Sequence, residues 1–332
     1  MICRIKLTVR GTTGDNYNWY RTVGRGVSAV NAGSEGTLVS VVIPTFNRPA
    51  EVDAAVASVL IQDVPCEVLV VDDGSNPQIL PVGSLADPSV RILRSAESTG
   101  PTLARSRGIE AASGRYIAFL DDDDIWLPGK LRRCLEVAAE HPEVRVVVHR
   151  TGLDVRMASK GAGNVRVEDQ PLFRYGRNAT PHLDSVLVDA ELAKAVGFDE
   201  NFYACQDIDF VLGLARQTPF AILDEVLALR GKDSPPSAIG IERRITGRNL
   251  LNVKHRDVFD SDPEARAFHL VRTAHLHRRG GDRARAIKDF FRALKHRPLY
   301  IPAWRGLVTT MLPSSVAANL SMQLRIMAEE RR

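Results

Sequence analysis

Residues 115–128 read Arg-Tyr-Ile-Ala-Phe-Leu-Asp-Asp-Asp-Asp-Ile-Trp-Leu-Pro, a short apolar run followed by four consecutive aspartates. Tyr116–Leu120 is rich in aromatic and branched residues and follows a Ser-Gly pair, which predicts a buried strand. Asp121–Asp124 would lie where this strand emerges, and open α/β sheets bind ligands beyond the carboxyl ends of their strands. Like charges this close raise one another's pKa unless a cation or solvent offsets them. The run therefore predicts either a cation site or a solvated acidic loop.

Predicted strands and helices alternate on both sides of this run. The predicted strands are 38–43, 67–71, 90–93, 116–120, 144–149, 183–188 and 221–229, and the helices are 49–61, 101–113, 128–140, 191–196 and 207–216. Near-continuous apolar strands that alternate with helices are typical of a mostly parallel sheet with helices on both faces. The Gly-rich segment 150–177 is expected to be irregular and to cross the outside of the sheet. The fold class is therefore α/β.

The chain is expected to divide into three parts. Residues 1–36 are Gly-rich and polar and suggest a poorly structured leader, although Ile2–Val9 alternates weakly as a strand would. Residues 37–235 form the predicted α/β domain. Residues 236–332 are predicted to be a helical, basic extension, because residues 241–332 contain 19 Lys and Arg against 9 Asp and Glu. A basic tail suggests either an anionic partner surface or a solvated helical face.

Composition and cysteine usage suggest a protein that stays inside the cell. The chain of 332 residues is 44% hydrophobic and 25% charged, which is ordinary for a globular protein. We find neither a signal peptide nor an apolar run near the ~18 residues of a membrane span. The expected location is cytoplasmic, with peripheral contact at the inner face of the membrane left open. Four scattered cysteines predict no disulfide framework and no zinc site: Cys3, Cys66, Cys134 and Cys205.

Further motifs lie at the ends of other predicted strands and helices. They are Pro44-Thr-Phe-Asn-Arg48, Val70-Val-Asp-Asp-Gly-Ser75, Gly100-Pro-Thr-Leu-Ala-Arg105, Gly197-Phe-Asp-Glu-Asn-Phe202 and Gln206-Asp-Ile-Asp-Phe210. With the acidic run, this ordered set resembles the family-2 glycosyltransferases, which use the A-type glycosyltransferase (GT-A) fold. The resemblance covers residues 38 to about 233. It implies an α/β GT-A domain followed by the α-helical C-terminal region.

The resemblance implies a site for the nucleotide of a nucleotide-diphosphate-sugar donor. Asp72 is expected to accept a hydrogen bond from the base, and Arg105 to lie near the diphosphate. Ser106 replaces the Asn that usually follows this Arg in the family. The complete set of implied donor-binding residues is Pro44, Thr45, Phe46, Asn47, Arg48, Asp72, Asp73, Arg105, Asp121 and Asp122.

The acidic run is similar to the DxD region of the family, which implies a divalent metal, Mg²⁺ or Mn²⁺. These hard cations take oxygen ligands, and Mg²⁺ is usually held by one or two carboxylates plus substrate phosphates. Alignment on the family pattern implies Asp121 and Asp123 as metal ligands, with Asp122 at the variable position. The run of four aspartates leaves this register open by one residue.

The resemblance implies Asp207 as the catalytic base, with Gln206 in place of the usual Glu. Inverting transfer needs a carboxylate that takes the proton of the acceptor hydroxyl. The alternative is an acidic residue that only stabilises a helix N-terminus, a role that Asp209 fits better. Downstream, Arg230 fits the family pattern, whereas Lys232 stands near the place of a His.

The predicted function is inverting transfer of a sugar to a hydroxyl of a glycan or lipid-linked acceptor, in cell-surface polysaccharide synthesis. A catalytically silent nucleotide-sugar-binding or scaffold protein that works through its helical tail is the alternative. A sugar nucleotidyltransferase is disfavoured because the first turn is Pro-Thr-Phe-Asn rather than Gly-rich and basic, and no nucleic-acid partner is expected. Residues 267–304 resemble a single tetratricopeptide-type helix pair, and residues 314–327 predict one more helix.

Overall fold

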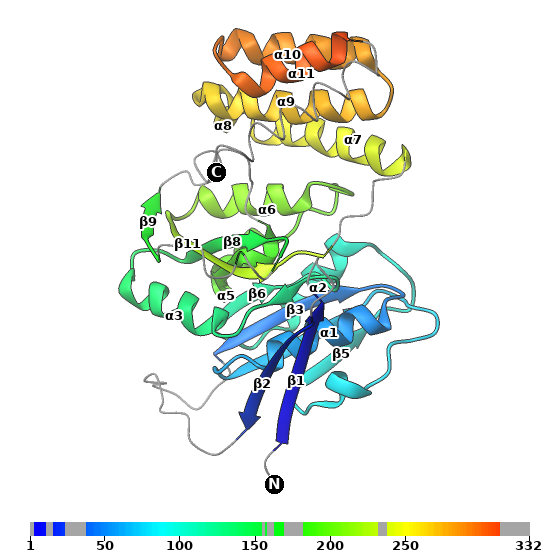
Figure 1. Ribbon diagram of the computed structural model, residues 1–332, viewed down its shortest axis with the longest axis vertical. Coiled ribbons are helices and arrows are strands. Elements are labelled where there is room, and N and C mark those ends of the chain that lie inside the picture. The colour runs from blue at the N-terminus through cyan, green and yellow to red at the C-terminus, as the bar shows by residue number, and fades with distance from the viewer. Residues whose placement is uncertain are drawn as a thin grey trace. The chain divides into compact units, whose positions relative to one another are not determined.

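The computed structural model describes residues 3–10, 16–23, 38–154, 157, 163–168, 182–231 and 238–312. The chain divides into two compact units, coloured in chain order in Figure 1. The first comprises Met1–Asn201 and Gln206–Asp233, and the second Phe202–Cys205 and Ser234–Arg332. The three-part division with boundaries at 36 and 235 remains our proposal for the domains.

The first unit is built on one nine-stranded sheet, and one half of it is parallel. The parallel strands lie in the order β5 (Val90–Arg94), β4 (Cys66–Asp72), β3 (Val39–Thr45) and β6 (Tyr116–Phe119). Every residue of β3 is buried, Pro44 included, so this strand continues two residues past the predicted end at Ile43. Because the strands run the same way, the loops that follow β3, β4 and β6 meet at one edge of the sheet.

The other half of the sheet is mixed. Strand β10 (Val186–Asp189) pairs antiparallel with both β6 and β8 (Val146–Gly152), and β8 pairs parallel with β11 (Phe220–Leu229). Two short strands, β7 (Ile125–Trp126) and β9 (Val165–Glu168), pair antiparallel with β11. The mostly parallel α/β sheet is confirmed. Strand β9 contradicts the expectation that residues 150–177 are irregular throughout.

Helices pack on both faces of this sheet. The helices of the first unit are α1 (Pro49–Leu60), α2 (Pro101–Ala111), α3 (Lys130–Glu140), α5 (Ala190–Val196) and α6 (Gln206–Ala215), with 3-10 turns η1 (Gly83–Ala86) and η3 (Leu183–Ser185). Val41 shares a buried apolar cluster with residues of α1 and α3. A Cβ at Gly108 of α2 would lie 2.2 Å from the side chain of Val42. Since neighbouring strand residues point to opposite faces, α1 and α2 cover opposite sides of β3.

The N-terminal region contains a paired hairpin. Strand β1 (Cys3–Arg10) pairs antiparallel with β2 (Asn16–Val23) over eight residue pairs. The expectation of a poorly structured leader is therefore wrong for these two segments, and the weak alternation of Ile2–Val9 was the better guide. An alternating pattern suits a strand with two different faces.

The second unit is helical. Its helices are α7 (Ala238–Lys254), α8 (Arg256–Ser261), α9 (Pro263–Arg279), α10 (Arg283–His296) and α11 (Ile301–Met311). Asp262 and Asp282 cap α9 and α10 by accepting backbone N–H groups of their first turns. The helix predicted over 314–327 lies outside the described residues. Within the described part of the chain, no helix has both the length and the apolar character needed to cross a membrane.

Candidate functional site

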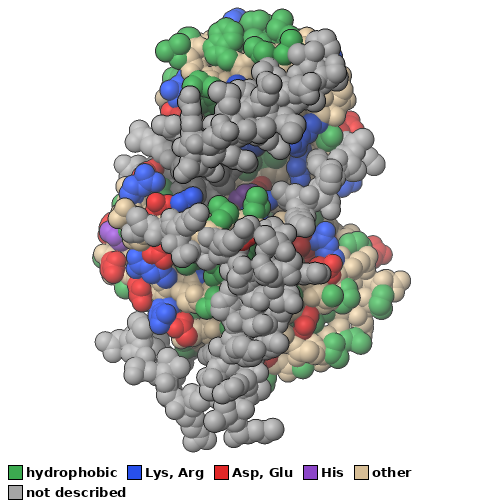
Figure 2. All heavy atoms as spheres, in the orientation of Figure 1, with side chains coloured by type: hydrophobic (Ala, Val, Ile, Leu, Met, Phe, Trp, Pro, Cys, Tyr) green, Lys and Arg blue, Asp and Glu red, His purple; other side chains and the backbone are tan. Residues whose placement is uncertain are grey.

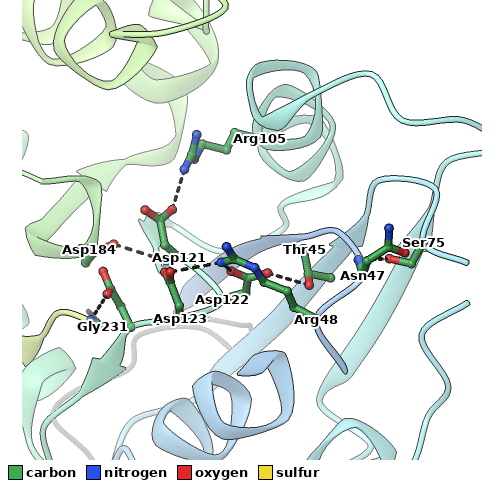
Figure 3. A network of polar contacts seen from close by, with 11 residues as sticks. Thr45, Asn47, Arg48, Ser75, Arg105, Asp121, Asp122, Asp123, Asp184 and Gly231 are labelled. Carbon is green, nitrogen blue, oxygen red and sulfur yellow. Dashed lines mark hydrogen bonds and ion pairs between the residues drawn. The ribbon is translucent and has the colours of Figure 1, made fainter. Parts of the chain in front are cut away.

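The acidic run lies at the carboxyl end of β6, where the chain from β3 also ends (Figure 3). Asp122 is buried and accepts hydrogen bonds from Thr45 Oγ1 at 2.8 Å and from Arg48 Nη1 at 3.0 Å. Arg48 also donates to Asp123 Oδ2 at 3.1 Å. Burial raises the pKa of Asp122 against the opposing effects of Thr45 and Arg48. The turn after β3 and the acidic run, predicted separately from sequence, therefore form one network.

The turn after β3 is fixed to the turn after β4. Asn47 has a positive φ of 57°, a conformation that Asn tolerates better than most residues. Its backbone N–H donates to Ser75 Oγ at 2.8 Å, and its Oδ1 accepts from Asn76 N at 2.8 Å. Phe46, one residue before, is 46% exposed. The turn thus carries an exposed aromatic side chain next to a residue that is hydrogen-bonded to the turn after β4.

Asp72 is fully buried and bonded by protein donors. Its Oδ1 accepts from Ser75 N at 2.9 Å, and its Oδ2 accepts from Arg94 Nη1 at 2.6 Å. Burial alone would raise the pKa of Asp72, but hydrogen bonds to Ser75 and Ile79 and the charge of Arg94 lower it overall. A bond from Asp72 to a nucleotide base would require this turn to open. The base-binding role of Asp72 stays a prediction.

Asp73 holds the loop that precedes α2. Its carboxylate accepts hydrogen bonds from the backbone N–H groups of Thr99 and Gly100 and from the Ser98 hydroxyl. Gly74 makes this close approach feasible: its φ is +82°, and a Cβ there would lie 2.7 Å from the backbone of Glu97. In the structure Asp73 positions the start of α2, the helix that carries Arg105.

Arg105 is buried and points at the acidic run (Figure 3). Its Nη2 donates to Asp121 Oδ1 at 2.5 Å, while its Nε and Nη1 are buried without a hydrogen-bond partner. Burial alone would lower the pKa of Arg105, but the carboxylates of Asp121, Asp207 and Asp184 outweigh it and raise the pKa. Arg105 is thus positively charged and interacts electrostatically with the predicted base Asp207. Its Nε and Nη1 remain available as hydrogen-bond donors to an anion.

A third segment, η3, contributes Asp184 to the site. Asp184 Oδ1 accepts from the backbone N–H of Asp121 at 3.3 Å, and the carboxyl groups of Asp184 and Asp124 hydrogen-bond each other. Asp124 also accepts from Gly231 N at 2.6 Å. Burial raises the pKa of Asp124 to about 6, and burial and the neighbouring carboxylates raise that of Asp184 well above its usual range. We infer that the pair shares a proton.

The residues present fit a divalent cation. One carboxylate oxygen each of Asp121, Asp124 and Asp184 lies within 4.8 Å of the others. The predicted ligand Asp123 lies outside this group and pairs with Arg48. Its side chain is 44% exposed and that of Asp121 41%, so both are open to a ligand arriving from solvent. Asp121 is therefore a candidate ligand both in the group with Asp124 and Asp184 and in the predicted pair with Asp123.

Lys130 lies fully buried near the acidic cluster. Its Nζ has no hydrogen-bond partner and lies 3.4 Å from the centroid of the Trp126 ring. Burial lowers the pKa of Lys130 to about 8, while the charges of Cys134 and Asp184 oppose this effect. His149 is also buried, and burial together with Lys130 lowers its pKa to about 3, so it is neutral. Lys130 therefore supplies a buried positive charge close to Asp184.

Comparison with known proteins gives the family. The model of the family "Glycosyl transferase family 2" matches residues 40–180. The succinoglycan biosynthesis protein ExoO of Rhizobium meliloti is 30% identical over 288 residues, which cover 79% of this chain and 78% of ExoO. The chain belongs to glycosyltransferase family 2. The matched residues 40–180 include the turn after β3, the turn after β4, the start of α2 and the acidic run.

Other relatives of this family-2 chain match over shorter stretches. The UDP-Glc:alpha-D-GlcNAc-diphosphoundecaprenol beta-1,3-glucosyltransferase WfgD of Escherichia coli is 38% identical over 96 residues, 28% of this chain and 38% of WfgD. The chain spans 64%, 42% and 18% of the length of three further curated relatives. The fold is GT-A: the solved structure of S. aureus TarS in complex with UDP-GlcNAc superposes with a TM-score of 0.54 at 16% identity, covering 83% of this chain and 80% of that one.

The structure brings most of the predicted site residues of this family-2 glycosyltransferase together. Thr45, Arg48, Arg105 and the acidic run form connected contacts, and the charge of Asp207 acts on Arg105. Lys232 lies outside the described residues. Sequence reasoning missed Asp184, because no motif or spacing marks it. The signal that would have found it is the antiparallel pairing of β10 with β6, which sets Asp184 opposite Asp121.

Proposed function

We propose that this chain is an inverting glycosyltransferase that transfers a sugar from a nucleotide-diphosphate-sugar to a hydroxyl of a glycan or lipid-linked acceptor. The observation that carries the proposal is Arg105, a buried cation with two unpartnered nitrogen atoms among carboxylates of the sheet edge. An anion such as a diphosphate satisfies those donors. The names of ExoO and WfgD support polysaccharide synthesis and a lipid-linked acceptor.

We assign the donor to the edge formed by the turn after β3, α2 and the acidic run. Phe46 offers an exposed aromatic ring to the nucleotide, and Arg105 donates to the diphosphate. Asp73 acts through the loop that places α2, so we propose it as a positioning residue. Asp122, bonded to Thr45 and Arg48, holds the turn against the acidic run.

We propose Asp121 and Asp123 as the ligands of Mg²⁺ or Mn²⁺. A divalent cation at this site would need coordination positions open to the substrate, and these two side chains are the exposed members of the run. The buried pair Asp124 and Asp184 is explained without a cation, because a shared proton removes the repulsion between two carboxylates. The metal, when bound, neutralises charge on the leaving diphosphate.

Asp207 is the proposed general base. It lies in the first turn of α6 and carries a charge that acts on Arg105, so it lies on the diphosphate side of the site. A carboxylate there takes the proton of the acceptor hydroxyl as its oxygen attacks the anomeric carbon. The diphosphate leaves on the opposite side, which inverts the configuration.

The test measures release of nucleotide diphosphate from donor sugars by the purified chain and by Asp207→Asn. We expect the substitution to reduce turnover by ~10²–10⁴-fold while donor binding survives, as for loss of a positioned proton acceptor. Glu191→Gln is the matched control, because Glu191 is also an acid in the first turn of a helix. No release by the wild type, with donor binding intact, would favour the silent scaffold.

We further propose that the protein contacts the inner face of the membrane peripherally. The lipid-linked acceptor requires access to a bilayer surface, and the C-terminal third carries the excess of basic residues. Anionic phospholipid attracts such clusters.

A further inference from the structure

Helix α11 has a buried apolar face and, beside it, an exposed apolar stripe. Its inner face is packed against α10, where a Cβ at Gly306 would lie 2.1 Å from the ring of Phe290. Its outer face carries four apolar side chains at spacings of three, four and three residues, which align along one stripe of a helix. They are 69%, 48%, 44% and 59% exposed, respectively: Ile301, Trp304, Val308 and Met311. An amphipathic helix normally exposes polar residues on this side, so the outer stripe is unusual.

Two further apolar side chains of the same helix pair are exposed. Leu299, just before α11, is 91% exposed, and Phe291 of α10 is 47% exposed. Figure 2 shows hydrophobic side chains gathered where Figure 1 draws α10 and α11 of the second unit. We call these six residues the α10–α11 face. Exposed apolar patches of this kind usually mark a binding surface.

The chain segment that carries most of the α10–α11 face is basic. Residues 283–312 contain seven Lys and Arg against one acid, Asp289. Asp289 is buried and already bonded by His277 and Arg292, so it offsets little of the surface charge. Burial and the charges of Arg266 and Arg292 lower the pKa of His296. The segment therefore combines an exposed apolar stripe with a net positive charge, although Arg285 pairs with Asp282 and Arg297 with Glu264.

We propose that the α10–α11 face binds the surface of a membrane that contains anionic phospholipid. An apolar stripe with Trp, flanked by Lys and Arg, is the pattern of helices that lie in the interface of a bilayer. Self-association is disfavoured, because a twofold pairing would set the two basic surrounds against each other. The inference deepens the membrane contact proposed above, and its role rests on the proposed lipid-linked acceptor.

The test uses the full chain and vesicles of neutral phosphatidylcholine with or without about one third phosphatidylglycerol. We expect sedimentation with the anionic vesicles, weak sedimentation with the neutral ones, and loss of binding as salt rises, because exposed charges are screened. Ile301→Ser/Trp304→Ser should weaken binding at least about tenfold, the size expected for losing buried apolar area. Leu80→Ser/Val82→Ser is the matched control, since these residues of the first unit are 51% and 62% exposed.

Three outcomes would overturn the proposal. They are no sedimentation of the full chain with anionic vesicles, an equal loss in both double variants, and a dimer in solution that only Ile301→Ser/Trp304→Ser disrupts while vesicle binding persists. Donor binding measured on the same variants separates this test from that of the transferase. A chain that binds donor but no vesicle contradicts only the membrane surface.

Discussion

Arg105 Nη2 lies 2.5 Å from Asp121 Oδ1, and this contact joins the start of α2 to the end of β6. The other two nitrogen atoms of the guanidinium are buried and unpartnered. In the proposed function, one side chain therefore holds an acid of the metal site and also faces the diphosphate. Donor and metal should bind interdependently, because both draw on the same ion pair.

Arg105→Met should reduce donor affinity about 10–100-fold, because a hydrogen bond to a charged group contributes about 1.5–3 kcal/mol. Calorimetric titration with a nucleotide diphosphate measures this directly. Arg107→Met is the matched control: Arg107 lies on the same helix but bonds Ser95 and the carbonyl of Arg94. If both variants lose affinity equally, Arg105 has only a structural role in α2.

The register of the metal ligands is tested by Asp123→Ala and Asp184→Asn. With donor and Mn²⁺ each at about 100 times Kd, the wild type should gain about 2.7 kcal/mol of stability per ligand, visible as a thermal shift. We expect Asp123→Ala to lose the part of the shift that needs Mn²⁺, and Asp184→Asn to keep it. The reverse result would place the cation among Asp121, Asp124 and Asp184.

The raised pKa values of Asp124 and Asp184 predict that the stability of the fold depends on pH. Burial raises the pKa of Asp124 to about 6, so the folded protein binds this proton more tightly than the unfolded chain. The resulting stabilisation is complete below the unfolded pKa of about 4 and is lost as pH rises through about 6. Burial and the charges of Asp121 and Asp124 raise the pKa of Asp184 as well, so Asp184 adds a pH dependence of the same sign. Asn at position 184 mimics a protonated carboxyl and removes this contribution of Asp184, whereas that of Asp124 remains because burial causes it.

Asp184→Asn should therefore match the wild type near pH 5 and exceed it near pH 7.5 by on the order of 1–3 kcal/mol. Denaturant unfolding at several pH values measures the difference. The variant keeps a group that can accept from Asp121 N, so the comparison isolates the charge. A constant difference at all pH values would mean that the pair holds no extra proton in the fold.

The sequence allowed correct predictions where charged residues come directly after an apolar strand in the same segment. The apolar run before Asp121 predicts both the strand β6 and the emergence of the acids, and parallel strands bring the turn after β3 to the same edge. The family resemblance implied Thr45, Arg48 and the acidic run as parts of one donor site, and their contacts follow from the pairing of β3 with β6. The family resemblance added the identity of Arg105 and Asp207 as site residues.

The site contacts that sequence analysis missed depend on the pairing of strands that are far apart in the sequence. Strand β10 is as apolar as the parallel strands, and its periodicity does not reveal that it runs antiparallel beside β6. The position of Asp184 beside the acidic run depends on this antiparallel direction. Likewise, the burial of Asp72 depends on Arg94, which extends from β5 to its carboxylate. Such contacts become visible only when strand order and direction are known.

We predict that the acidic run can keep its backbone position only with glycine at position 231. Its backbone N–H donates to Asp124 Oδ1 at 2.6 Å, and a Cβ at this position would lie 2.3 Å from the carbonyl oxygen of Asp123. Gly231→Ala must therefore displace the backbone of Asp123, a proposed metal ligand. We expect weaker metal-dependent donor binding and a loss of about 1–3 kcal/mol of stability, as for other overpacked sites.

Gly280→Ala is the control for this substitution. Its added Cβ meets no atom closer than 3.5 Å, and its φ of −76° suits any residue, so its stability should be unchanged or rise by about 0.4–1 kcal/mol. Donor titration with Mn²⁺ and denaturant unfolding on both variants separate a local effect on the site from a general effect of replacing glycine. If Gly231→Ala binds donor as the wild type does, the position of the Asp123 backbone does not govern metal binding, and the ligand set must lie deeper in the acidic cluster.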